Sequence, residues 1–100
     1  MGPRLTIDHA RLTAFCQKWK VAELSLFGSV IRPDFRSDSD VDVLVCPAAD
    51  AAWTLFDWVE MRDELAAIFG RSIDLVSTRG LRNPFRRREI LSNREVVFAA

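Results

Sequence analysis

The sequence has few of the residues that several protein classes require. Its 100 residues include 2 cysteines, 4 glycines and 4 prolines, which excludes a disulfide scaffold, a collagen repeat and a low-complexity chain. The cysteines, Cys16 and Cys46, have no metal-ligand spacing and are predicted to be small buried residues in a reducing compartment. The only histidine, His9, gives no basis for a zinc site or a serine–histidine triad.

Long apolar runs and excess charge are also missing. No apolar run approaches the roughly 20 residues of a membrane span, and the first residues show no signal-peptide pattern. The 14 basic residues balance the 14 acidic ones, so bulk electrostatics argues against direct binding of nucleic acid. We therefore expect residues 1–100 to form a single soluble cytoplasmic domain with no membrane partner.

The charges that are present are unevenly distributed along the chain. Residues 34–64 contain nine acidic residues and two arginines, whereas residues 79–95 contain six arginines and two glutamates. An acidic centre followed by a basic end suits a site that holds both metal and phosphate. Ordinary solvated faces would explain the charge pattern equally well.

Two hydrophobic periods alternate along the chain and predict an α/β (α+β) fold. Helical spacing predicts a first helix that follows Thr6 or Asp8, a second over 52–69 ending at Gly70, and a third from Pro84 to about residue 91. Strands are expected over 21–27, 41–46 and 72–77, with an edge strand over 95–98. The prediction is a small mixed β-sheet packed with about three to four helices.

Two of the predicted buried strands carry an acid that a structural role does not need. Asp42 and Asp74 each interrupt an apolar strand, where an ionised carboxylate is costly unless it is paired or binds a metal. Asp40 lies two residues before Asp42, so both side chains point to the same face of an extended chain. If Asp74 lies on a neighbouring strand, the three carboxylates converge into a site that suits Mg²⁺.

A small-residue turn follows the first predicted strand. Gly28 and Ser29 end that strand, and a strand that passes through such a turn into a helix points backbone N–H groups outward. This is a ready anion site, to which Arg32 could add a cation, although a plain strand-to-helix turn or an Arg32–Asp34 pair would also account for these residues. Together with the acids, the turn predicts that phosphate and metal are held side by side.

These residues form a combined motif that resembles a known family. Gly28-Ser29, the ten residues 30–39 and then Asp40-Val41-Asp42 resemble the signature of the minimal nucleotidyltransferases, the smallest relatives of DNA polymerase beta. The segment 70–76, with Asp74, is similar to the family's third-acid strand, and 82–100 is similar to its last helix and strand. The sequence departs from many relatives at Ile31 and Pro33, while Arg32 is retained.

The resemblance implies a palm-like fold and a mechanism. Asp40, Asp42 and Asp74 would ligate two Mg²⁺ ions, and Asp74 would also help deprotonate an acceptor hydroxyl. Gly28, Ser29 and Arg32 would bind the triphosphate of a nucleoside triphosphate such as ATP, and the hydroxyl would attack the α-phosphate with pyrophosphate leaving.

Relatives of this type are commonly paired with HEPN ribonuclease toxins. The resemblance therefore implies an antitoxin that transfers AMP from ATP to a tyrosine of a HEPN-type partner. A protein partner also suits the excess of apolar residues along 53–61, although a second layer of the fold could equally cover them.

Three alternatives to this role stay open. The chain could be a non-catalytic module that neutralises its partner by masking it, or it could transfer a nucleotide to a small molecule in a pocket built by a homodimer. The basic end (Arg82, Arg86, Arg87 and Arg88) could bind the nucleotide, RNA or an acidic partner surface.

Overall fold

The computed structural model describes residues 7–28 and 40–100. They form a four-stranded mixed sheet in the order β3-β2-β1-β4, in which β1 (Val21–Phe27) is antiparallel to both β2 (Val41–Pro47) and β4 (Glu95–Ala99). β2 and β3 (Ile73–Ser77) are parallel. This is the predicted α/β fold with a small mixed sheet, and β4 is the predicted edge strand.

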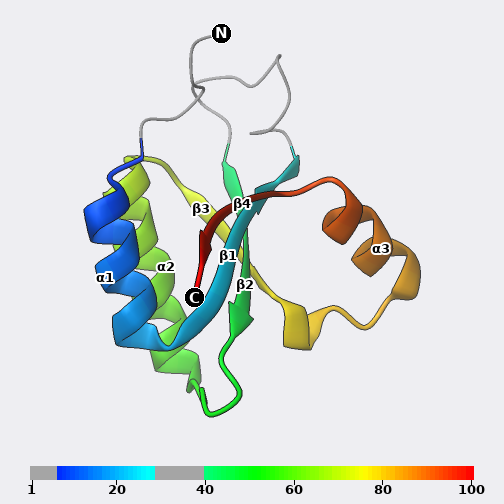
Figure 1. The fold of residues 1–100 in the computed structure, drawn as a ribbon, viewed down its shortest axis with the longest axis horizontal. Helices are drawn as coiled ribbons and strands as arrows, with labels where there is room; N and C mark the ends of the chain where they lie inside the picture. Colours follow the sequence, from blue (N-terminus) through cyan, green and yellow to red (C-terminus); the bar gives the residue numbers. More distant parts are fainter. Residues whose placement is uncertain (1–6, 29–39) are drawn as a thin grey trace, which may run out of the picture.

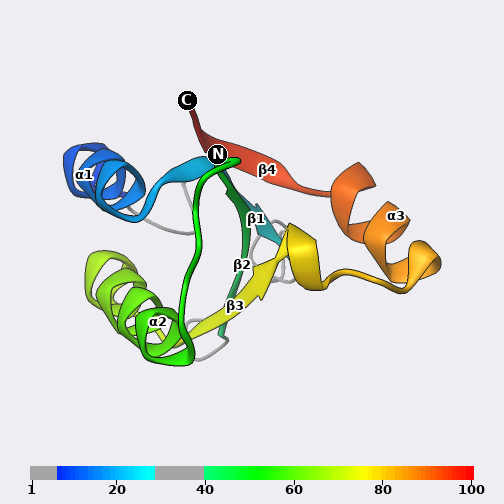
Figure 2. The same cartoon turned by 90° about the horizontal axis from the view of Figure 1, so that it is seen from below.

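The helices cover the two faces of the sheet unequally (Figures 1 and 2). α1 (His9–Trp19) and α2 (Leu55–Phe69) lie together on one face, whereas α3 (Pro84–Ser92) alone packs on the other. A short 3₁₀ turn, η2 (Thr78–Gly80), which the sequence did not predict, leads from β3 towards α3. Throughout the described ranges, every helix is too short or too polar to cross a bilayer.

The helix ends follow from local side-chain chemistry. Asp8 caps α1, where its carboxylate accepts the Arg11 N–H at 3.1 Å, and Asn83 caps α3 ahead of proline, as predicted. The predicted start of the second helix at residue 52 is wrong, because Thr54 forms a capping box with Asp57 and α2 therefore begins at Leu55. Thr6, the other candidate cap of α1, lies outside the described residues.

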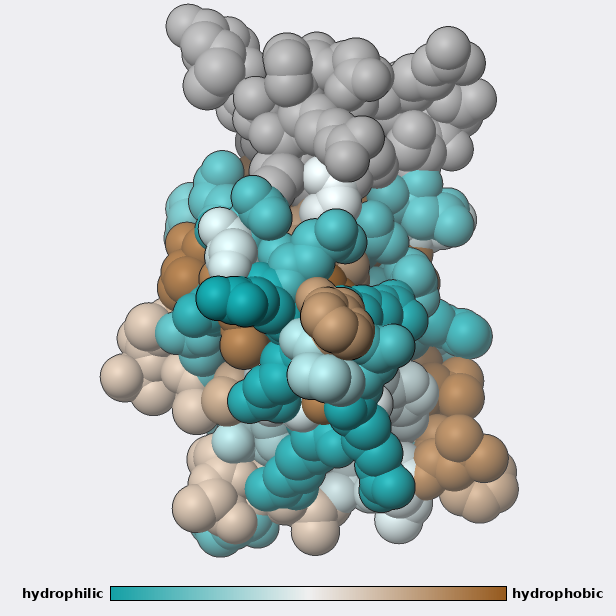
Figure 3. Space-filling model, turned by 90° about the vertical axis from the view of Figure 1, so that its right-hand side faces the viewer, coloured by the Kyte–Doolittle hydropathy of each residue, from teal (hydrophilic) through white to brown (hydrophobic). Residues whose placement is uncertain are grey.

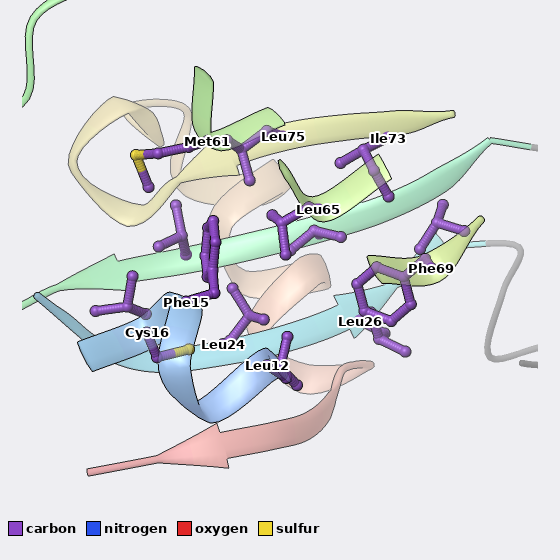
Figure 4. Packing of buried hydrophobic residues seen from close by; sticks show 14 residues of the cluster. Leu12, Phe15, Cys16, Leu24, Leu26, Met61, Leu65, Phe69, Ile73 and Leu75 are labelled. Carbon is purple, nitrogen blue, oxygen red and sulfur yellow. The ribbon is translucent and has the colours of Figure 1, made fainter. Parts of the chain in front are cut away.

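The main core lies between the sheet and the α1–α2 pair (Figure 4). Alternate residues of the strands supply one side of this core, and the apolar stripes of α1 and α2 supply the other side. Its fully buried members include Leu12, Leu24, Val41, Val43, Val45, Met61 and Leu65. Cys16 is buried in this core and Cys46 is half-buried, and both are free thiols.

A second, smaller core lies on the opposite face beneath α3. It consists of Phe27, Leu44, Leu81 and Ile90, with Val76 and Leu91 packed against it. Beside it, Arg94 pairs with Glu23 and donates to the Ser25 hydroxyl at 3.1 Å, which ties the start of β4 to β1. Seen directly, this face carries mostly hydrophilic side chains around α3 (Figure 3). Because Leu44 lies in this second core and other β2 residues lie in the main core, β2 contributes buried residues to both faces of the sheet, as its apolar run predicted.

Candidate active site

The parallel pairing of β2 and β3 places two of the predicted acids side by side. Asp42 is the direct register partner of Asp74. Asp42 alternates with Leu44, and Asp74 alternates with Val76, and both of these apolar residues pack in the core beneath α3. The two carboxylates therefore extend from the α3 face of the sheet, on the side away from the main core.

Asp40 adds a third negative charge next to this pair. It directly precedes β2 and lies two residues from Asp42, and the adjoining Val41 N–H donates to the Ser72 carbonyl at 2.9 Å, which fixes β2 against the start of β3. Burial raises the pKa of the Asp42 carboxyl above its usual value. Repulsion from Asp74, a hydrogen bond with Asp74 and repulsion from Asp40 raise this pKa further, while Arg86 opposes them.

The burial of the acids differs from the sequence-based expectation. Asp42 is only half-buried, and both Asp40 and Asp74 are exposed. The expectation that Asp74 interrupts a buried strand is wrong, because β3 is an edge strand and its α3-facing side is covered only near Val76. The carboxylates consequently stand at a solvent-accessible place, where a water-soluble substrate can reach them.

Gly28 lies in direct contact range of the Asp42 carboxylate. It follows Phe27, the register partner of Asp42, and its backbone has φ +72°, a conformation that other residues rarely adopt. A Cβ placed on Gly28 would lie 3.2 Å from Asp42 Cγ and would collide with Asp42 Oδ2. Glycine is thus required here both by the backbone and by the space. The predicted phosphate-binding residues Ser29 and Arg32 lie outside the described residues.

The carboxylate oxygens suit Mg²⁺, although they do not form a closed cage. Within residues 7–28 and 40–100, no group of three Asp, Glu, His or Cys side chains is arranged to hold a metal ion. Mg²⁺ is usually held by one or two carboxylates together with substrate phosphates, so a complete protein cage is not needed before a nucleotide arrives. The adjacent Asp42 and Asp74 carboxylates would provide oxygen ligands for such a cation. The cation would in turn relieve the repulsion between their charges.

Sequence comparison places the chain among known proteins. Residues 11–97 match the sequence profile of the Nucleotidyltransferase domain family. The protein adenylyltransferase MntA of Thermococcus cleftensis is 32% identical over 82 residues, which span 82% of this chain and 78% of that protein.

Structural comparison gives the same fold. A toxin–antitoxin crystal structure with AMP-PNP superposes with a TM-score of 0.74 at 18% identity, over 94% of this chain and 75% of that one. A Shewanella oneidensis structure, a tri-AMPylated HEPN toxin in complex with MNT antitoxin, gives a TM-score of 0.64 at 18% identity, over 92% and 70% of the two chains. The sheet, the helices and the matched profile together show that this chain belongs to the Nucleotidyltransferase domain family of enzymes.

Proposed function

We propose that the chain is a Mg²⁺-dependent adenylyltransferase that moves AMP from ATP to a hydroxyl, in particular a tyrosine of a HEPN-type toxin, and so acts as its antitoxin. The observation that carries this proposal is the Asp42–Asp74 pair beside the left-handed Gly28 turn. The naming of the Thermococcus relative as a protein adenylyltransferase, and the AMPylated toxin in the Shewanella complex, support the donor and the class of acceptor.

The three acids have two roles in the proposed reaction. Asp40 and Asp42 would bind both Mg²⁺ ions, and Asp74 would bind one of them and take the proton of the acceptor hydroxyl. Bound Mg²⁺ would supply neutralisation of phosphate charge. Gly28 brings its backbone close to the triphosphate without a side chain between them, and Ser29 and Arg32 would complete the phosphate contacts. The hydroxyl oxygen bonds to the α-phosphorus as the bond to pyrophosphate breaks.

The exposure of the acids suits a macromolecular acceptor. Asp40 and Asp74 are open to solvent, so the reacting phosphate is accessible to a side chain on the surface of another protein. A patch on the first turns of α2 (Leu55, Phe56 and Val59, the α2 apolar patch) offers a contact surface, because Leu55 and Phe56 are 77% and 86% exposed. Because α2 covers the sheet face opposite to the carboxylates (Figure 2), we assign this patch to the body of the protein partner and not to the segment that carries the acceptor hydroxyl. The sequence suggested that part of the apolar set along 53–61 is exposed and left open whether a second layer covers it. Phe56 and Val59 are exposed, whereas Met61 is buried in the main core and Trp53 and Trp58 pack against it.

The test is label transfer from ATP labelled in its α-phosphate, with Mg²⁺, to the product of the neighbouring gene. The expected result is label on a tyrosine of that product, lost when EDTA replaces Mg²⁺. Since this chain contains no tyrosine, tyrosine-linked label can only belong to the acceptor. Neutralisation of the partner without label would instead show a masking antitoxin. Label on an added aminoglycoside alone would show transfer to a small molecule.

A further inference from the structure

The first turn of α3 carries an arginine on the side that faces the sheet. Arg86 lies four residues before Ile90, and positions i and i+4 occupy the same face of a helix. Ile90 is buried against Phe27 and Leu44, the residues that flank Asp42 along and across the strands. Helix geometry therefore directs the Arg86 side chain along the α3 face of the sheet, where the acids stand.

The Arg86 guanidinium lies on the same side of the sheet as the acids but is not paired with them. Ile90, one turn further along α3, packs on Phe27, the register partner of Asp42, which keeps the first turns of α3 on the Asp42 side of the sheet. Among the residues that the structure describes, Arg86 shows no ion pair within 4.0 Å and its side chain makes no hydrogen bond, whereas the neighbouring Arg87 donates to the Thr78 carbonyl at 3.2 Å. The guanidinium thus stands back from the carboxylate oxygens and leaves them available to a metal.

The proposed reaction requires a further cation near the phosphates of the nucleotide. A nucleoside triphosphate and three carboxylates together carry more negative charge than two divalent ions neutralise. An arginine binds phosphate oxygens through two parallel N–H donors and remains charged at any physiological pH. Because the reacting phosphate would occupy the space next to the carboxylates, a guanidinium set back from them is positioned for the phosphates beyond it.

We propose that Arg86 binds the β- and γ-phosphates of the nucleotide and stabilises the pyrophosphate as it leaves. This inference rests on the proposed nucleotidyl transfer and adds a phosphate-binding residue from the last helix. Arg88 provides a matched control, because it is an exposed arginine on the same helix but lies two positions on, on the side opposite to Arg86.

The experiment compares the dissociation constants of ATP and of AMP, each with Mg²⁺, for the full chain and its Arg86→Gln, Arg86→Lys and Arg88→Gln variants by calorimetry. We expect Arg86→Gln to weaken ATP binding by about 10- to 100-fold, the usual loss of a charged hydrogen bond, with AMP binding unchanged. Arg86→Lys should weaken ATP binding by an intermediate amount, because lysine keeps the charge but not the two parallel N–H donors. Arg88→Gln should bind ATP as tightly as the wild type.

Two results overturn the assignment of Arg86. One is equal ATP affinity in Arg86→Gln and Arg88→Gln, and the other is a parallel loss of ATP and AMP binding, which a distorted fold would cause. Melting curves of all variants identify such a distortion. A wild-type chain that binds no ATP would instead remove the nucleotidyl-transfer proposal itself, so failure of the two proposals can be told apart.

Discussion

Among single residues, Asp42 is the one whose position suits chemistry better than stability. It is half-buried beside Asp74, and burial together with the neighbouring acids raises its pKa. Gly28 approaches it so closely that any larger residue would collide with its carboxylate. A neutral side chain at position 42 would remove the repulsion, so the carboxylate is retained at a cost to the folded state.

We expect Asp42→Asn to lower the rate of nucleotidyl transfer by about a thousandfold or more, because asparagine lacks the negative charge with which Asp42 would bind the metal beside the phosphate. Without Mg²⁺ its melting temperature should equal or exceed that of the wild type, because a repulsive contact is relieved. Label transfer and thermal melting measure the two effects. Asp63→Asn, at an exposed α2 position, should change neither. An unchanged rate in Asp42→Asn would contradict the catalytic role, and a lower melting temperature would contradict the repulsion.

Cys16 gives a prediction about pH. Burial raises the pKa of its thiol to about 12, so at pH 8 only about one molecule in ten thousand carries the reactive thiolate. Iodoacetamide at pH 8 should therefore spare Cys16 in the folded chain, and any label detected by mass spectrometry should lie on the half-buried Cys46. The folded state holds the Cys16 proton more tightly than the unfolded chain does. The contribution of this thiol to the free energy of unfolding is therefore lost as pH rises from about 9 to about 12. Rapid labelling of Cys16 in native buffer would contradict this account.

Among the elements, α2 depends most clearly on a local signal. Its capping box joins the Thr54 hydroxyl to the Asp57 N–H at 3.1 Å and the Asp57 carboxylate to the Thr54 N–H at 3.0 Å. We expect Thr54→Ala to lower the free energy of unfolding by about 1 kcal/mol, because the Asp57 N–H loses the hydroxyl that accepts its hydrogen bond. Urea denaturation measures this change. Thr54→Ser keeps the hydroxyl and should lose much less, and equal losses in the two variants would show that the cap is not responsible.

Local signals explain which parts of the fold could be predicted from the sequence. The spans of β1 and β4 and the caps of α1 and α3 follow from alternation, Asp8 and Asn83–Pro84, which act over a few residues. The start of α2 was misplaced because residues 52 and 53 suit a helix and outweighed the capping-box spacing of Thr54 and Asp57, which marks the true beginning. The 3₁₀ turn Thr78–Gly80 has no periodic pattern and could not be predicted.

The candidate site could be predicted only in part, because local signals act over a few residues. The spacing of Asp40 and Asp42 predicts that both lie on one face, but the proximity of Asp74 to Asp42 depends on strand order, which no local pattern contains. The exposure of Asp74 likewise depends on β3 being an edge strand. Arg86 was visible only as one of four basic residues. Its separation from Ile90 is the signal that could have singled it out, once Ile90 was known to be buried beneath α3.

At the scale of the whole molecule, two exposed phenylalanines allow the partner surface to be located. Phe56 of the α2 apolar patch is 86% exposed, and Phe85 of α3 is 84% exposed. We expect Phe56→Ser to weaken the complex with the proposed HEPN-type partner at least about tenfold, because an aromatic anchor buried in an interface dominates binding, and Phe85→Ser to weaken it less, because Phe85 lies outside the α2 apolar patch. Surface plasmon resonance measures both. The reverse ranking would move the interface to α3, and intact binding in both variants would remove the patch from it.

The unequal cover of the two sheet faces has a consequence for divergence. Most of the buried apolar residues lie between the sheet and the α1–α2 pair, while α3 shields a small cluster around Phe27 and Leu44. Folding energy is thus concentrated on one side of the sheet and the proposed chemistry on the other. Surface positions around the carboxylates therefore contribute little to stability, and we expect substitutions there to alter the choice of acceptor hydroxyl while the hydrophobic half keeps the chain folded.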